Sequence, residues 1–274
     1  MRAPVTGRPL EVAGITFDFG NTLVRVDRAG IRAVVRATAA ALANRGAIAD
    51  TSAFLAAWVA ERDRQFRIQV PRLLEVDLTE RVGHVLGALR GARVPTNDDQ
   101  AWDDAATDGL VDPEEIRFAV DTYSDGFVAT MPALPEADLT LRAVRAAGYR
   151  LGILSNWPLA RTIDRYVEAH GWNELLTAVV VSQRVGRIKP HPAIFGAAAT
   201  ALGLPPDRLL HIGDDWAADV VGANRAGWRA GYLRGHQGDT PLPTSARDAS
   251  VTADLELDSL AELLPHLGAG ASST

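Results

Sequence analysis

The second half of the chain alternates between strand-like and helix-like segments, and this rhythm limits the fold more than any other feature. From Pro132 onward, short apolar runs rich in β-forming residues alternate with longer segments that carry apolar residues at helical spacing. This order is typical of parallel strands joined by helical crossovers, because parallel neighbours cannot be joined by a tight turn. Strands are expected at 149–154, 178–182, 209–212, 229–233 and, at the edge of the sheet, 253–257; helices are expected at 139–148, 159–170, 192–202, 217–226 and 260–267.

The first half of the chain has a different organisation. Residues Gly14–Asp18 form a short apolar run typical of a strand, and a loop follows at 20–30. For about a hundred residues the apolar positions then follow helical spacing, and no strand is expected. The last of these helices should begin after Asp112, because Pro113 suits the first helical position and the acids that follow favour the helix dipole.

Together these patterns predict an α/β protein with a Rossmann-like parallel sheet core and an inserted all-helical module. The chain has 274 residues, of which 47% are hydrophobic, and this is enough for such a core and a smaller second module. The expected core comprises residues 1–26 and 131–267, and the expected helical module comprises residues 27–130. Residues 268–274 are expected to form a disordered tail.

Composition argues against several kinds of partner. The net charge of -6 provides no overall attraction for nucleic acid, and the absence of cysteine excludes disulfides and thiolate metal sites. The first residues lack the apolar stretch of a signal peptide, and no run has the roughly 18 apolar residues of a membrane span. We therefore expect a cytoplasmic protein that binds neither nucleic acid nor membranes. The acidic run at 97–108 is expected to be a solvated surface loop or a short helix without a metal, and the oligomeric state is not predicted.

Polar residues stand at or soon after the ends of four expected strands. Asp18 ends the first strand, Ser155 follows the second, Lys189 comes after the third, and Asp214 follows the fourth. The carboxyl ends of parallel strands meet at one edge of a sheet, which is where doubly wound folds bind ligands. Two carboxylates at this edge would repel each other without a cation between them, so Asp18 and Asp214 favour a magnesium site.

These segments resemble the four motifs of the haloacid dehalogenase superfamily. DFGNTL at 18–23 resembles motif I, LSN at 154–156 resembles motif II, and the Lys189-Pro190 pair resembles motif III. GDDWAAD at 213–219, followed by GANRAG, resembles motif IV of a phosphatase-rich subgroup. Each motif is short, but four in this order and spacing are specific. The resemblance implies a helical cap between motifs I and II and magnesium-dependent hydrolysis of a small phosphorylated substrate.

The resemblance also implies a role for each residue at the sheet edge. Asp18 is the expected nucleophile, which attacks phosphorus to form an aspartyl-phosphate. Lys189 should offset the negative charge on Asp18 and the phosphoryl group, and Ser155 should donate a hydrogen bond to a phosphoryl oxygen. The magnesium ion would be bound by Asp18, Asp214 and the backbone carbonyl of Gly20.

The remaining expected residues support this centre. Asp219 would fix the metal's water shell or orient Lys189, and Asp215 would do the same or cap the following helix. Those expected on the substrate side are Asn156, Asn21 and Thr22, with Thr22 also bracing the motif I turn.

Gly20 is the main departure from the family pattern. Most phosphatases of the family carry a second Asp at this position, which protonates the leaving oxygen and later activates water. Glycine can offer its carbonyl to a metal but cannot transfer a proton. The expected reaction is therefore the hydrolysis of a phosphate with a good leaving group, or one in which the cap or the substrate supplies the proton.

Two other functions fit the same motifs. A 2-haloacid dehalogenase would use Asp18 to attack carbon without a metal, but the acid-rich motif IV then has no evident purpose. A binding or regulatory protein would keep the fold and lose turnover. The sequence does not identify the substrate; its candidate recognition residues are Arg25, Arg28, Arg64, Arg67 and Arg72, most of them expected at the surface. Core packing is the expected role of Trp157, Trp216 and His191, and lining of the pocket is the alternative for each of them.

Overall fold

The computed structural model describes residues 9–97, 99–103, 105–235 and 239–268, and its centre is a parallel sheet. The six strands lie in the order β3-β2-β1-β4-β5-β6, and all neighbouring pairs are parallel. As predicted, the last strand lies at the edge. The strands are β1 (Gly14–Phe17), β2 (Arg150–Ser155), β3 (Ala178–Val181), β4 (Leu209–Gly213), β5 (Arg229–Leu233) and β6 (Leu255–Leu257).

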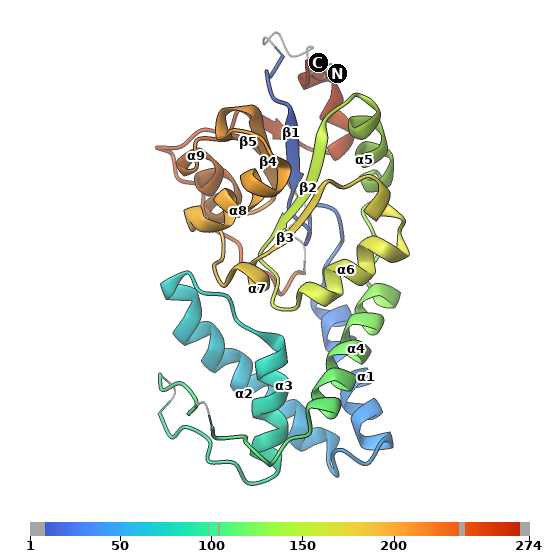
Figure 1. Cartoon of the computed structure of the whole chain (residues 1–274), viewed down its shortest axis with the longest axis vertical. Coiled ribbons are helices and arrows are strands. Elements are labelled where there is room, and N and C mark those ends of the chain that lie inside the picture. The colour runs from blue at the N-terminus through green and yellow to red at the C-terminus, as the bar shows by residue number, and fades with distance from the viewer. Residues whose placement is uncertain (1–8, 98, 104, 236–238, 269–274) are drawn as a thin grey trace.

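Helices cover both faces of this sheet. On β2, Leu151 and Ile153 pack into one hydrophobic cluster, whereas Leu154 packs into the other, because successive side chains of a strand point to opposite faces. Burial on both faces explains the nearly continuous apolar strands. Figure 1 shows α5 (Ala137–Ala146) and α6 (Ala160–Ala169) on one side of the sheet. On the other side lie α7 (Ser182–Val185), α8 (Pro192–Leu202) and α9 (Gly222–Arg225), which continues a π-helical turn at Trp216–Val221.

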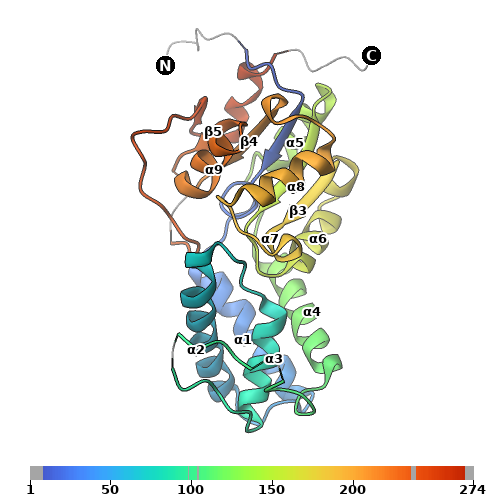
Figure 2. The ribbon, with the colours of Figure 1, turned by 60° about the vertical axis from the view of Figure 1, so that its left-hand side comes forward.

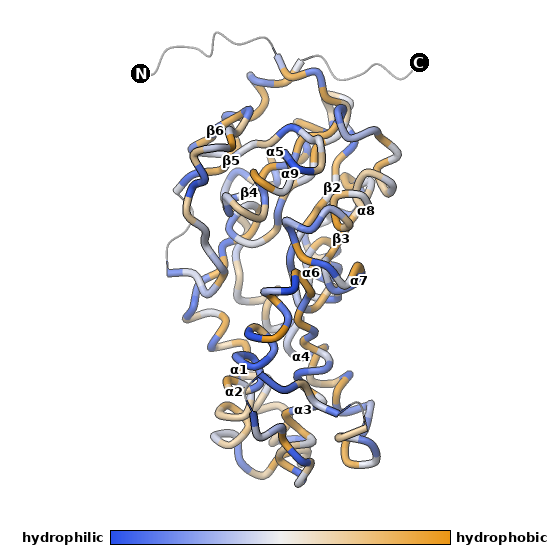
Figure 3. The backbone as a smooth tube through the Cα atoms, turned by 90° about the vertical axis from the view of Figure 1, so that its left-hand side faces the viewer, coloured by the Kyte–Doolittle hydropathy of each residue, from blue (hydrophilic) through white to orange (hydrophobic). Residues whose placement is uncertain are grey.

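The segment between β1 and α5 forms a helical module. Its helices are α1 (Arg28–Asn44), α2 (Thr51–Gln69), α3 (Leu78–Leu89) and α4 (Pro113–Thr130). Each begins after an Asp whose side chain accepts a backbone N–H of the first turn, a favoured N-cap arrangement; the caps are Asp27, Asp50, Asp77 and Asp112. Figure 3 shows that each helix carries both hydrophobic and hydrophilic residues, as expected where one face packs against its neighbours.

The helical module lies beyond the carboxyl ends of the strands (Figure 2). The chain leaves and re-enters the core side by side, since Val24 and Ala133 form an antiparallel bridge and the Arg25 N–H donates to Pro132 at 2.9 Å. The start of α3 also contacts the core, where the Leu78 N–H donates to the Pro158 carbonyl at 2.9 Å. The predicted class, a Rossmann-like parallel sheet with an inserted all-helical domain, is therefore confirmed.

One predicted helix is wrong. The apolar spacing predicts a helix over 260–267, whereas the structure has two 3₁₀ turns at Leu260–Glu262 and Leu264–His266. Pro265 lacks the N–H that a continuing helix needs, and its ring clashes with the preceding turn. The predicted tail falls almost wholly on residues 269–274, which lie outside the described residues. Across the described ranges, every helix is too short or too polar to cross a membrane.

Candidate active site

Asp18 is presented by the central strand of the sheet. Its N–H donates to Ile212 at 2.8 Å, so the backbone continues the β1–β4 register one residue beyond β1. The neighbouring rings of Phe17 and Phe19 are fully buried, but the Asp18 side chain is 13% exposed. The turn after the strand therefore directs one carboxylate to the carboxyl edge of the sheet.

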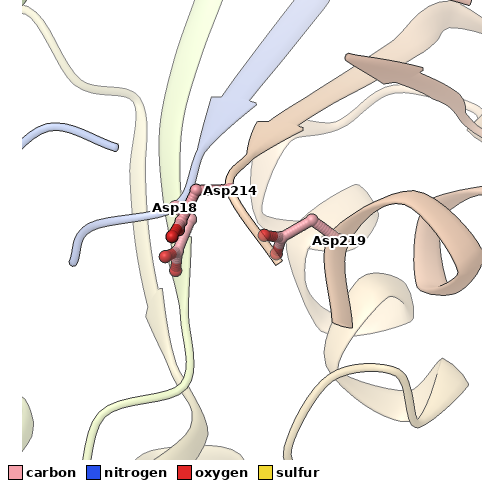
Figure 4. Close-up of side chains that lie close together, drawn as sticks. All are labelled: Asp18, Asp214 and Asp219. Carbon is pink, nitrogen blue, oxygen red and sulfur yellow. The ribbon is translucent and has the colours of Figure 1, made fainter. Parts of the chain in front are cut away.

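Two further carboxylates meet Asp18 at this edge. Asp214 follows β4, the strand beside β1, and Asp219 belongs to the helical turn after it. One oxygen of each of the three side chains lies within 4.8 Å of the others. Figure 4 shows Asp18 and Asp214 next to each other and Asp219 reaching toward them from its helix. The three predicted acids thus form one cluster.

Lys189 is the cation of this cluster. Its Nζ donates to Asp18 Oδ1 at 2.8 Å, to Asp219 Oδ1 at 2.7 Å and to the Leu154 carbonyl at 2.9 Å, which uses all three ammonium protons. Burial alone would lower the pKa of Lys189, but the carboxylates of Asp18 and Asp219 raise it above its usual value. Lys189 therefore stays charged and bridges the two acids.

Asn156 holds the backbone of Lys189 in place. Its Oδ1 accepts the Lys189 N–H at 2.6 Å, and its Nδ2 donates to the Lys189 carbonyl at 3.1 Å. The Lys189-Pro190 peptide is cis. Because both ends of the Asn156 amide bind the protein, its side chain acts here as a positioning group. Its predicted contact with substrate stays a prediction.

Asp219 is held by a buried network that includes His211, a residue that the sequence reasoning missed. Asp219 Oδ1 lies 3.0 Å from His211 Nε2, and Oδ2 accepts the Asp215 N–H at 2.9 Å. The other ring nitrogen of His211 lies 2.8 Å from Thr16 Oγ1. Burial would raise the pKa of Asp219, but Lys189 and His211 hold it well below its usual value. Asp219 is therefore an ionised support for Lys189.

Asp18 and Asp214 have the opposite electrostatic setting. Burial raises the pKa of both carboxyls, and the charges of Asp18 and Asp219 raise that of Asp214 further. A divalent cation between these groups would remove this penalty, and carboxylate and carbonyl oxygens are the donors that magnesium prefers. Thr22 Oγ1 donates to Asp214 Oδ1 at 3.4 Å, so the Thr22 side chain helps to position this acid. The donor set therefore fits magnesium.

Two buried polar atoms, one at the end of β2 and one just after it, lack protein partners. Among the described residues, Ser155 Oγ and Trp157 Nε1 have no hydrogen-bond partner, although both side chains are buried. An unpaired buried donor is costly unless a ligand or water satisfies it. The Ser155 hydroxyl is thus available for the phosphoryl oxygen that the resemblance implies.

The segment after β5 packs against the motif I loop. Asn21 Nδ2 donates to Thr240 Oγ1 at 3.0 Å, and Asn21 Oδ1 accepts the Val26 N–H at 3.2 Å. A Cβ added to Gly20 would lie 2.5 Å from Leu242 Cδ1. The side chain of Asn21 therefore holds two loops together, and its predicted contact with substrate stays a prediction.

Several predicted residues have structural roles. Asp215 caps the helix after β4 by accepting the Ala218 N–H at 2.7 Å, which confirms the capping alternative. Trp157 and Trp216 are buried, as expected for core packing, but His191 is only partly buried and caps α8 through Ala193. Arg64 is buried rather than at the surface, and its guanidinium binds the carbonyls of Pro95, Asn97 and Gln100.

A carboxylate at the end of the central strand, a bridging lysine and two further acids at the carboxyl edge of a parallel sheet define a hydrolase-type centre. Residues 12–227 match the haloacid dehalogenase-like hydrolase family, so the chain belongs to this family.

Curated relatives match the chain over part of their length. The chain is 30% identical over 153 residues to a glyceraldehyde 3-phosphate phosphatase of Methanopyrus kandleri, covering 56% of this chain and 64% of that protein. It is 30% identical over 161 residues to haloacid dehalogenase-like hydrolase domain-containing protein 3 of Mus musculus, covering 58% and 62%. The chain thus spans less than two thirds of the length of these relatives.

Solved structures share the whole fold. A 2-haloacid dehalogenase from Pseudomonas syringae superposes with a TM-score of 0.62 at 19% identity, covering 93% of this chain and 97% of that one. A HAD phosphatase from Thermococcus onnurineus gives a TM-score of 0.59 at 20% identity, covering 95% and 100%. Because a dehalogenase and a phosphatase share this fold, the fold alone does not choose the reaction.

Proposed function

We propose that the chain is a magnesium-dependent phosphatase that hydrolyses a small organic phosphate through an aspartyl-phosphate on Asp18. The observation that carries the proposal is the cluster of Asp18, Asp214 and Asp219, in which Lys189 Nζ contacts Asp18 and Asp219. A dehalogenase needs no metal, whereas phosphoryl transfer uses a cation that Asp214 would hold together with Asp18. The phosphatase names of several relatives support the same choice.

In the first step, an Asp18 carboxylate oxygen attacks phosphorus and the bond from phosphorus to the ester oxygen breaks. Lys189 offsets the negative charge that gathers on the carboxylate and phosphoryl oxygens, and Ser155 Oγ donates to one of those oxygens. In the second step, water attacks phosphorus, inorganic phosphate leaves and the Asp18 carboxylate is restored.

Magnesium would be held by Asp18, Asp214 and the Gly20 carbonyl, where it would supply electrostatic stabilisation of the phosphoryl oxygens. Asp219 would not bind the metal, because both of its carboxylate oxygens already bind protein groups. Its role would be to keep Lys189 in position.

The residue at position 20 narrows the proposed substrates. No side chain there can protonate the leaving oxygen, so substrates with weakly basic leaving groups should react best. We further propose that α1–α4, within residues 27–130, act as a cap that closes over residues 1–26 and 131–267 of the core.

A phosphate-release screen with magnesium tests the proposal. Sugar phosphates, acyl phosphates, aryl phosphates and small organic phosphates are compared with and without excess chelator, together with a 2-haloacid. Chelation should abolish phosphate release, magnesium should restore it, and Asp214→Asn should raise the magnesium concentration needed. Halide release that survives chelation would favour the dehalogenase, and no turnover of any substrate would favour a binding or regulatory protein.

A further inference from the structure

A buried arginine in the helical module lacks a counter-charge. The side chain of Arg81 lies within α3 and the residue is only 4% exposed. Its Nε donates to Gln65 Oε1 at 2.8 Å, and its guanidinium lies 5.4 Å from the centre of the Trp58 ring. Within the described ranges, Nη2 is buried without a hydrogen-bond partner and Arg81 forms no ion pair. A buried guanidinium without an anion is costly, so this arrangement requires an explanation.

Arg81 remains a cation under physiological conditions. Burial lowers its pKa to about 10, and the carboxylates of Glu61 and Glu75 favour its charged form. Neither carboxylate forms an ion pair with it, although both lie in the module around it. The positive charge is therefore present but incompletely balanced.

Arg81 lies at the end of the module that faces the active site. The first residue of α3, Leu78, donates its N–H to Pro158, which directly follows Trp157. Arg81 is three residues further along the same helix, or about 5 Å along its axis. Figure 1 shows the start of α3 turned toward the sheet edge.

Contacts of α4 give the same location. Tyr123, whose ring lies 6.2 Å from the Trp58 ring that Arg81 contacts, is four residues and so about one helical turn from Phe127. The Phe127 ring lies 5.2 Å from that of Trp157 and 6.1 Å from that of Phe19, the residue after Asp18. Arg81 and Tyr123 therefore lie about one helical turn further from the sheet than Phe127 and the aromatic side chains next to Asp18.

Buried donors without acceptors lie on both sides of this region. Ser155 Oγ and Trp157 Nε1 are unpaired on the core side, and Arg81 Nη2 is unpaired on the module side. Native proteins leave few buried donors unpaired, so unpaired donors on both the core side and the module side of this region indicate that a ligand supplies acceptors. The one on the module side is a cation, so it calls for an anionic acceptor.

We propose that Arg81 is a specificity residue that binds a second anionic group of the substrate, a carboxylate or a second phosphate, while Lys189 and Ser155 receive the phosphoryl group. This inference rests on the proposed phosphatase function and narrows its substrate class to phosphate monoesters that carry a further negative charge. Gln65 and Trp58 hold the guanidinium in place for this contact.

Matched substrates test the inference. A series of carboxyalkyl phosphates of increasing chain length is compared with the corresponding carboxamides, and bisphosphates with the corresponding alcohols. One charge-assisted hydrogen bond typically changes affinity by about 10- to 100-fold, so the best charged substrate should have a kcat/KM higher than its neutral partner by that factor. Arg81→Gln should reduce this ratio to near one, and Arg81→Lys should retain part of it.

The ratio within each variant is independent of the folded fraction, so a partly unfolded Arg81→Gln preparation still gives an answer. Arg36→Gln, which changes an exposed arginine of α1, is the control and should keep the parental ratio. Equal rates for charged and neutral partners in the parent would overturn the inference and leave the phosphatase proposal intact. A ratio that survives in Arg81→Gln would also overturn it.

Failure of the proposed function is recognised separately. If no phosphate is released from any substrate, binding of a carboxyalkyl phosphonate and of the matching alkyl phosphonate is measured by calorimetry in magnesium. If the parent binds the carboxyalkyl phosphonate more tightly and Arg81→Gln does not, the anion site at Arg81 is supported even without turnover. Equal binding of the two phosphonates by the parent would rule out this anion site.

Discussion

At the scale of single residues, two of the three clustered acids should respond differently to the same substitution. Burial raises the pKa of Asp18, so its ionised form destabilises the native protein, whereas Lys189 and His211 lower the pKa of Asp219. In metal-free protein at neutral pH, Asp18→Asn should raise the free energy of unfolding by about 1 kcal/mol and abolish turnover. Asp219→Asn should lower it by about 3 kcal/mol, because a buried lysine loses a partner.

Urea unfolding of the parent, Asp18→Asn and Asp219→Asn in chelator measures this difference in unfolding free energy. Circular dichroism before unfolding is the control for a native fold in each variant. If Asp18→Asn destabilised the protein as much as Asp219→Asn, the Asp18–Lys189 ion pair would outweigh the cost of burying Asp18. Near-parental turnover of Asp18→Asn would rule out the aspartyl-phosphate.

Gly20 gives a second prediction at this scale. Its φ is not in the left-handed region, so a side chain there is opposed chiefly by Leu242 Cδ1. Leu242→Ala should remove this obstacle. In the double variant Gly20→Asp/Leu242→Ala, kcat/KM for alkyl phosphates should rise by about tenfold or more, because a proton donor matters most for basic leaving groups. Aryl phosphates with good leaving groups should change little.

A plot of log kcat/KM against leaving-group pKa provides the measurement. It should be steep for the parent and for Leu242→Ala alone, and flatter for the double variant. A flat plot for the parent would mean that another group already supplies the proton. An equal change for all leaving groups in the double variant would indicate altered loop geometry.

Some residues of the site could be predicted from sequence and others could not. Asp18, Lys189, Asp214 and Asp219 each stand near the end of a recognisable strand, and parallel topology then brings them to one edge. His211 lies inside a buried strand, and only its neighbours in space distinguish it from a packing residue. Arg81 occupies a buried position of α3. Its unpaired nitrogen becomes evident only when α2, α3 and α4 are packed together, so the sequence does not reveal it.

At the scale of elements, the loop between α2 and α3 should make stability depend on pH. Glu75 belongs to this loop, and its Oε2 accepts a hydrogen bond from Ser182 Oγ of α7. Burial raises the pKa of Glu75 from 4.5 to about 7. The folded protein therefore holds this proton more tightly than the unfolded chain. The resulting stabilisation is complete below about pH 4.5 and is lost as pH rises through 7.

Glu75→Gln removes this titration while keeping a polar side chain. Between pH 5 and 8, the parent should lose about 2–3 kcal/mol of unfolding free energy relative to Glu75→Gln, since each pKa unit is worth about 1.4 kcal/mol. Urea unfolding at both pH values gives the two differences. Glu168→Gln, at an exposed position of α6, should follow the parent. Parallel pH profiles for the parent and Glu75→Gln would contradict the raised pKa.

Element boundaries were predictable wherever a cap or a glycine ended the pattern. Asp112 and Pro113 mark the start of α4, and α8 runs from Pro192 to Leu202 as expected. The helix expected at 260–267 does not form, because Pro265 interrupts it. The apolar spacing favours a helix there, but a proline inside the segment is the stronger signal. The π-helical turn at Trp216–Val221 has no sequence signal that distinguishes it from an α-helix.

At the scale of the whole molecule, the helical module contacts the core at three places. One is the pair of connections near Val24 and Ala133, the second is the bridge between Leu74 and Arg187, and the third is the packing of α4 on α6, where Arg165 pairs with Asp121 and Asp125. The second pairing is reinforced by the Ile188 N–H, which donates to Leu73 at 3.2 Å. Because the Asp18 side chain is only 13% exposed, substrate should enter when this second contact opens.

A disulfide across the second contact tests whether opening is required. Leu74 and Arg187 face each other as a non-hydrogen-bonded antiparallel pair, whose Cα atoms typically lie about 4.5 Å apart and suit a disulfide. The chain has no cysteine, so Leu74→Cys/Arg187→Cys introduces the sole disulfide. Oxidation should lower kcat/KM by at least about tenfold and reduction should restore it, because the module would be held against the core. The two single-cysteine variants should show no effect of oxidant. Full turnover by the oxidised double variant, with the bond verified by mass, would mean that substrate enters without separation at this contact and reaches Asp18 from the side of the motif I loop.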